Sequence, residues 1–107
     1  MSKFGDKVYE LLRQVPKGKV TTYKELANAL NTSAYRAIGQ IMRTNPDAPH
    51  TPCHRCVSSN GTIGGFNGTT SGPDIDRKIS MLESEGIEFE GNKIKDFETR
   101  LHKFILP

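Results

Sequence analysis

The chain has 107 residues, a hydrophobic content of 35%, a net charge of +3 and a pI near 9.0. This length suits one compact domain and is short for two. No apolar run approaches the roughly 20 residues of a membrane span, and the N-terminus lacks a signal-peptide core. We therefore expect a soluble intracellular protein, cytoplasmic or, in a eukaryote, nuclear. The mild positive charge is compatible with a nucleic-acid partner but does not by itself indicate one.

Two helices are predicted first. Apolar residues recur at three- and four-residue spacing over residues 7–15, and Pro16 ends this helix. An extended stretch over residues 19–21 leads to Thr22. Thr22 and Glu25 form a capping box for a second helix that runs to about residue 30.

A third helix is predicted from residue 34 to about residue 43, with Ser33 as its candidate N-cap. The short polar turn before it indicates a helix-turn-helix over about residues 22–43. One face of this helix is apolar, and the opposite face is basic and polar. The apolar face holds Ala34, Ala37, Ile38, Ile41 and Met42, and the other face holds Arg36, Gln40 and Arg43. That second face is either an ordinary solvated surface or a DNA contact.

The middle of the chain is predicted to be rich in loops. Three prolines in residues 45–52 predict an irregular connection. Asn60-Gly61 lies between residues 56–58 and 62–65, which predicts a small hairpin. The Gly, Thr and Ser residues of 67–72 predict a flexible loop.

The last third predicts two helices around a second hairpin. Pro73 suits the first turn of a fourth helix, and Gly86 suits its left-handed end. A second hairpin is predicted over residues 87–95 and a last short helix over residues 96–104. The expected fold class is therefore mostly α with small β hairpins, in a single domain that resembles a winged helix-turn-helix.

The motif Pro-Cys-His-Arg-Cys at residues 52–56 concentrates the reactive side chains. Cys53 and Cys56 make a CxxC pair, but thioredoxin-like redox pairs begin a helix after a strand, and this pair follows a proline-rich loop. A metal site could use His50 and His54 with the two cysteines. Structural zinc usually needs two separated ligand pairs, however, and only the lone His102 lies elsewhere. We expect neither a redox pair nor a metal site.

Two interpretations of the cysteines remain open. Either thiol can be a small buried hydrophobic group, which suits Cys56. Cys53 can also be a nucleophile, because the adjacent His54 could take its proton and Arg55 would add a positive field that favours the thiolate.

Four ordered segments resemble the C-terminal domain of the methylated-DNA–protein-cysteine alkyltransferases. They are RAIGQIMRTNP at 36–46, PCHR at 52–55, IGGF at 63–66 and LESEG at 82–86. The resemblance begins at the segment VPKGKVTTY and implies single-turnover DNA repair, in which an alkyl group moves from the 6-oxygen of a flipped guanine to the protein. The implied partner is double-stranded DNA containing O6-alkylguanine, bound in the minor groove by a monomer without metal or other cofactor.

The resemblance implies a role for each matching catalytic residue. Cys53 falls on the alkyl acceptor, His54 on the imidazole that deprotonates it through a bound water, and Glu85 on the carboxylate that orients this imidazole. Asn45 falls on the hinge asparagine between the DNA-binding helix and the active-site loop, expected at about residues 45–56. Tyr23 falls on the tyrosine that helps rotate the nucleotide and supports proton delivery to the leaving guanine.

DNA contacts are also implied. Arg36 falls on the arginine that enters the duplex and fills the gap left by the flipped base. The remaining implied contacts to DNA are Tyr23, Ala37, Gln40 and Arg43, and the implied base pocket is lined by Phe66, Pro52 and Gly65. Ordinary structural roles compete with these assignments: Glu85 as a solvated helix-end charge, Tyr23 and Phe66 as core aromatics, Arg36 as a surface arginine.

The sequence departs from the family pattern at several positions. His50 and Thr51 stand where apolar residues usually precede PCHR, Cys56 replaces a usual valine, and the loop after Phe66 is lengthened. The N-terminal domain common in this family is expected to be absent. Two rivals remain: an alkyltransferase-like protein, which binds O6-alkylguanine without transfer and usually has tryptophan in place of Cys53, and a winged-helix transcription factor with an inert cysteine.

Overall fold

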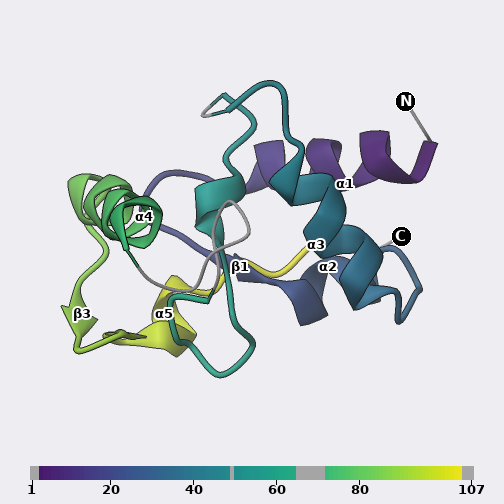
Figure 1. The fold of residues 1–107 in the computed structure, drawn as a ribbon. Coiled ribbons are helices and arrows are strands. Elements are labelled where there is room, and N and C mark those ends of the chain that lie inside the picture. Colours follow the sequence, from purple (N-terminus) through teal and green to yellow (C-terminus); the bar gives the residue numbers. More distant parts are fainter. Residues whose placement is uncertain (1–2, 49, 65–71, 105–107) are drawn as a thin grey trace.

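The computed structural model describes residues 3–48, 50–64 and 72–104 (Figure 1). Within these residues the chain forms short strands between helices. In chain order the elements are α1 (Lys3–Gln14), β1 (Thr21–Thr22), α2 (Tyr23–Ala29), α3 (Tyr35–Arg43), the 3-10 helix η1 (Cys53–Arg55), β2 (Cys56–Val57), α4 (Pro73–Ser84), β3 (Phe89–Glu90), β4 (Lys93–Ile94) and α5 (Phe97–Arg100).

Two apolar clusters hold these elements together. One joins α1, α2 and α3 to the two cysteines, and its buried members include Leu12, Leu26 and Ile38. The other lies between β2, α4 and the β3–β4 hairpin, and its buried members include Val57 and Leu82. Figure 1 shows α1, α2 and α3 on one side of β1 and α4 on the other. The segment from η1 to β2 therefore connects the two clusters.

The second helix has the predicted N-cap, Thr22. The Thr22 hydroxyl accepts a hydrogen bond from the Glu25 backbone N–H at 3.1 Å, which satisfies one of the free donors at the helix start. The predicted Ser33 cap of α3 is wrong. The N-cap is Ala34, which makes no side-chain cap bond, and the Thr32 hydroxyl accepts from the Ala34 N–H instead.

The apolar face of α3 is narrower than predicted. Ile38 and Met42 are buried against α1 and α2, and Ile41 is partly buried. Ala34 and Ala37, which the pattern placed on the same apolar face, are exposed. Both are small enough to be tolerated in solvent, and the larger apolar residues Ile38, Ile41 and Met42 supply the contact with the core.

The predicted first hairpin is wrong. β2 pairs in parallel with β1, with Thr21 opposite Cys56 and Thr22 opposite Val57. A turn does form at Asn60-Gly61, where the Ser58 N–H donates to the Thr62 carbonyl, but no ladder follows it. The reason is tertiary: β2 pairs with β1, and the second arm of the predicted hairpin pairs with β4 instead, through a bridge between Thr62 and Lys93 and a bond from the Ile94 N–H to the Gly61 carbonyl.

The last third of the chain forms the predicted kinds of element, but its last helix is shorter than predicted. The second hairpin is confirmed, because β3 and β4 pair antiparallel around Gly91. The last helix ends at Arg100, earlier than predicted. Leu101 instead makes a parallel bridge with Val20, and the His102 N–H donates to the Val20 carbonyl at 2.7 Å.

The fold class is confirmed, since the described residues form a mostly helical domain with small two-stranded sheets. In the described part of the chain we find no helix with the length and apolar character required to traverse a bilayer. The predicted loop over residues 67–72 lies almost wholly outside the described residues.

Candidate active site

Asn45 ties together the two ends of the loop that leads to Cys53. Its side-chain amide donates to the Thr51 carbonyl at 2.8 Å, and its side-chain oxygen accepts from the Asp47 N–H at 2.9 Å. The same Thr51 carbonyl accepts from the Cys53 N–H at 2.9 Å. One amide side chain thus links residues near the start of this loop to residues near its end.

Thr51 anchors this loop to the first helix. Its buried hydroxyl accepts from Arg13 of α1 at 2.8 Å and donates to the Asp47 carboxylate at 3.0 Å. The Asp47 carboxylate also contacts His50 Nδ1 at 2.9 Å. Hydrogen bonds from His50 and Thr51 lower the pKa of Asp47. The sequence predicted no role for Arg13 or Asp47, since neither lies in a recognisable motif.

The Cys53 side chain is nearly enclosed. Only 7% of the residue is exposed, and it packs in the cluster formed by α1, α2 and α3. Cys53 opens η1, and its carbonyl accepts from the Cys56 N–H. Both cysteines are free thiols.

His54, Glu85 and Arg55 form one connected group. His54 Nε2 lies 2.9 Å from Glu85 Oε2. Arg55 donates from Nε to Glu85 Oε1 at 2.9 Å and from a terminal nitrogen to Glu85 Oε2 at 3.0 Å. Its other terminal nitrogen donates to the Val15 carbonyl at 2.7 Å. The carboxylate therefore holds the imidazole and is itself held by a bidentate guanidinium.

The electrostatics of this group favour a neutral imidazole beside a charged carboxylate. Burial, with smaller contributions from the charges of Arg55 and Lys78, lowers the pKa of His54 against the opposing influence of Glu85. Burial raises the pKa of Glu85, but the hydrogen bonds and charges of Arg55 and His54 together leave that pKa lowered. A neutral imidazole has a free lone pair, so His54 can accept a proton at neutral pH.

Lys78 is a buried cation that the sequence analysis missed. It is 0% exposed, and its ammonium donates to the carbonyls of Cys56 at 2.8 Å and Ile63 at 2.6 Å. Burial lowers its pKa to about 8, against the opposing influence of the two cysteine thiols. Its spacing along α4, three residues after Ile75 and four before Leu82, places it on the buried face. That spacing is the signal that could have revealed it.

Cys56 differs from Cys53 in its surroundings. It is 1% exposed, and burial raises its pKa to about 12 although the nearby Lys78 opposes this. A thiol with such a pKa is almost entirely protonated at neutral pH. These properties agree with the expectation that Cys56 is a small buried hydrophobic group.

Tyr23 opens α2 beside the cysteine cluster. It is partly buried and packs against that cluster. Burial, with smaller contributions from Cys56 and Cys53, raises the pKa of its phenol. The hydroxyl therefore keeps its proton at neutral pH and can donate it.

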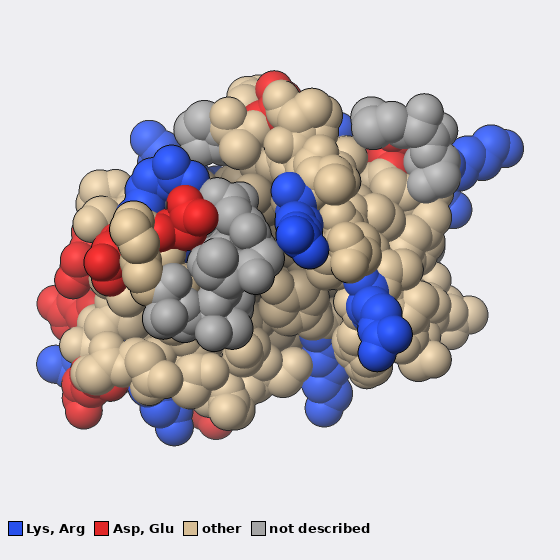
Figure 2. Space-filling model, in the orientation of Figure 1, with Lys and Arg blue, Asp and Glu red and all other residues tan. Residues whose placement is uncertain are grey.

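The exposed surface of α3 carries Arg36, Ala37, Gln40 and Arg43. A Cβ added at Gly39 would meet no protein atom within 4 Å, so packing inside the chain does not demand a glycine there. In Figure 2 most acidic side chains lie on the half that holds α4 and β3, whereas basic side chains occur on both halves and have few acidic neighbours on the half that holds α2 and α3. This half of the surface can attract a polyanion.

The structure brings together some of the residues predicted for the site. Cys53, His54, Pro52 and Asn45 share one loop, and Glu85 joins them from the end of α4. The α3 residues that the sequence predicted to contact DNA are exposed. Phe66 and Gly65 lie outside the described residues. Within the described ranges, no group of three or more His, Cys, Asp or Glu side chains could hold a metal ion.

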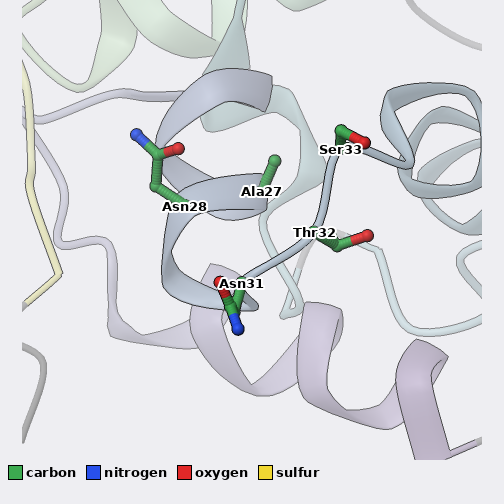
Figure 3. Close-up of a pocket in the computed structure, with 5 residues that line it drawn as sticks. All are labelled: Ala27, Asn28, Asn31, Thr32 and Ser33. Carbon is green, nitrogen blue, oxygen red and sulfur yellow. The ribbon is translucent and has the colours of Figure 1, made fainter.

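A polar hollow lies at the turn between α2 and α3. It has a volume of about 450 Å³ and is lined by Ala27, Asn28, Asn31, Thr32 and Ser33. Figure 3 shows it between the last turn of α2 and the segment that enters α3. It contains no ionisable side chain, so it offers no acid–base chemistry.

Comparisons with known proteins agree with this geometry. A family described as "6-O-methylguanine DNA methyltransferase, DNA binding domain" matches residues 3–87. The methylated-DNA–protein-cysteine methyltransferase of Thermococcus kodakarensis is 45% identical over 89 residues, which cover 82% of this chain and 47% of that protein. The chain spans about half the length of the curated methyltransferases of this name that it matches.

A second group of relatives matches over nearly their full length. Alkyltransferase-like protein 1 of Schizosaccharomyces pombe is 33% identical over 110 residues, covering 98% of this chain and 95% of that protein. Its crystal structure with damaged DNA containing O6-carboxymethylguanine superposes with a TM-score of 0.80 at 31% identity and covers 96% of this chain and 97% of that one. By its sequence and its fold, the chain belongs to the 6-O-methylguanine DNA methyltransferase family, of which it holds the DNA-binding domain.

Proposed function

We propose that this protein repairs DNA by moving an alkyl group from the 6-oxygen of a flipped guanine to Cys53, once per molecule. The observation that carries the proposal is the connected group of His54, Glu85 and Arg55 immediately after Cys53. A thiol followed by a neutral imidazole, with a carboxylate that orients the imidazole, is an arrangement that activates a nucleophile.

The transfer needs one proton to travel. His54 takes the Cys53 proton, through a water molecule as in the family, and the sulfur attacks the alkyl carbon. The carbon–sulfur bond forms as the bond between carbon and the guanine 6-oxygen breaks. Tyr23, whose phenol is protonated, supplies a proton to the departing guanine and recovers one from His54. The products are a thioether on Cys53 and an unmodified guanine, so the acceptor is spent.

Transfer from a duplex requires that the protein bind the DNA and extrude the damaged base. A guanine 6-oxygen inside the stack cannot be reached by a thiol, and extrusion costs a few kcal/mol. Arg36 of α3 is exposed and is proposed to fill the gap, with Ala37, Gln40 and Arg43 against the minor groove. The open space at Gly39 lets the DNA backbone approach the helix closely. We propose that one monomer acts on one lesion.

A second candidate function is lesion binding without transfer. It is favoured by the match to the alkyltransferase-like protein, whose structure contains damaged DNA. Cys53 favours transfer, because a thiol is present at the acceptor position. The enclosed position of that thiol makes a direct chemical test necessary.

Intact-mass and peptide mass spectrometry after incubation with a duplex containing O6-methylguanine provide this test. We expect one added methyl group, located on Cys53, and none with an otherwise identical undamaged duplex. Cys53→Ala should keep lesion binding and lose transfer. Unmodified protein that still prefers the damaged duplex would establish the non-transferring function, and equal affinity for both duplexes would favour a plain DNA-binding module.

A further inference from the structure

Tyr35 stands apart from the other large hydrophobic residues of the described chain. It is 47% exposed and is the large hydrophobic side chain that the described residues leave in solvent. By contrast, Tyr9 is buried, and Tyr23 packs against the core. A single exposed aromatic is common on protein surfaces. The residues around Tyr35 indicate whether its exposed ring could bind a partner.

These neighbours form a basic surface without acidic residues. Tyr35 is the first residue of α3, whose nine residues include Arg36 and Arg43 and no Asp or Glu. Tyr35, Gly39 and Arg43 are spaced by four, so they line one edge of the helix. A Cβ added at Gly39 would meet no protein atom within 4 Å, so neither packing nor a side chain fills this position between Tyr35 and Arg43. An aromatic residue and a cation therefore lie one turn to either side of a position without a side chain.

This combination matches the chemistry of a duplex opened at one base pair. Proteins that act in the minor groove insert apolar side chains between base steps, and aromatic rings stack on exposed base faces. When one nucleotide leaves the stack, the face of the neighbouring base loses its partner. In the gap left by the flipped nucleotide, Arg36 can form hydrogen bonds and supply charge. An aromatic ring is better suited to stack on the exposed face of the neighbouring base.

We propose that Tyr35 is a second wedge, whose ring stacks on the base next to the flipped nucleotide while Arg36 occupies the gap. The proposal rests on the function proposed above and adds a contact on the DNA side. Tyr35 is a binding residue and takes no part in the proton transfers at Cys53.

Three variants separate this role from others. Tyr35→Ala should weaken binding to a duplex containing O6-methylguanine about 10- to 100-fold, as measured by fluorescence anisotropy. Tyr35→Phe, which keeps the ring, should bind within about threefold of the unmodified protein. Arg43→Ala should lower the slope of log affinity against log salt concentration by about 1, whereas Tyr35→Ala should leave this slope unchanged, because stacking releases no counterions.

The reaction with the free base O6-benzylguanine keeps the two proposals distinguishable. Tyr35→Ala should react with it at the rate of the unmodified protein, since no duplex is involved, and circular dichroism should show the same helix content. Unchanged affinity of Tyr35→Ala for the damaged duplex would overturn the wedge and leave alkyl transfer intact. Equal losses in Tyr35→Phe and Tyr35→Ala would also overturn it. If the unmodified protein reacts with neither substrate, it is the proposed alkyl transfer that fails.

Discussion

Replacing Glu85 by Gln removes one charge from the centre of the His54–Glu85–Arg55 group. Glu85 and Arg55 are 11% and 12% exposed, and their two hydrogen bonds at 2.9 and 3.0 Å make a charged bidentate pair. Removal of one partner from a fully buried pair costs about 3–5 kcal/mol. Because Gln keeps an acceptor oxygen and the site has some solvent contact, we expect a loss of about 2–3 kcal/mol in the free energy of unfolding. For a chain of this size this is a fall of roughly 10 °C or more in Tm.

The same substitution should alter the acid side of the stability profile. The pKa of Glu85 is lowered in the folded protein from its usual 4.5, so its contribution is present above pH 4.5 and is lost as the pH falls through the folded value. Glu85→Gln lacks this contribution at every pH. The difference in stability between the two proteins should therefore shrink in acid, which urea titrations at pH 7 and pH 3 would measure.

Glu83→Gln is the matched control, because Glu83 lies two residues earlier on α4 and is exposed. Glu85→Gln should also slow methyl transfer by about 100-fold without changing DNA affinity, since the imidazole loses its orienting partner. The reasoning is refuted if Glu85→Gln unfolds within about 0.5 kcal/mol of the unmodified protein, a change typical of surface sites, or if the two variants slow transfer equally.

Three further predictions concern single groups. The pKa of Cys56 is raised to about 12 from 9.0, which lowers its thiolate fraction at neutral pH about 1000-fold. Iodoacetamide should therefore leave Cys56 unlabelled in the native protein and label it in urea. Rapid labelling of Cys56 in the native protein would contradict its burial. Thr22→Ala should lower the free energy of unfolding by about 1 kcal/mol, because the Glu25 N–H loses its cap, and Thr22→Ser should restore most of it in urea titrations. The pKa of Lys78 is lowered to about 8 from 10.5, so between these pH values the unfolded chain binds more protons than the folded one, and the free energy of unfolding rises with pH. Lys78→Met should remove this rise. A pH profile of stability that is the same in both proteins between pH 8 and 10 would contradict the prediction.

The sequence alone was sufficient for local features and for the motif. The N-cap at Thr22, the start of α4 at Pro73 and the left-handed Gly86 follow from interactions within a few residues, and the structure shows each of them. The order of the RxNP, PCHR and LESEG segments was also sufficient to indicate the family, since such spacing is rarely met by chance.

Only the tertiary structure decided which distant groups meet. Residues 56–57 carry a hairpin signal, yet they pair with β1, because a neighbouring strand offers backbone partners that a local turn cannot match. The last helix stops at Arg100 for the same reason, since Val20 binds the chain that follows. Short segments of this kind have no strong preference of their own, so contacts far along the chain determine their conformation.

The same division applies to the candidate site. The resemblance predicted that Glu85 orients His54, and His54 Nε2 does lie 2.9 Å from Glu85 Oε2. It did not predict that Arg55 would bind the same carboxylate. Nor did it reveal the buried Lys78 or the Arg13–Thr51 link to α1. These contacts join residues 22 to 38 positions apart. Burial fixes them, because a charged or polar side chain removed from water must find a partner wherever the fold supplies one.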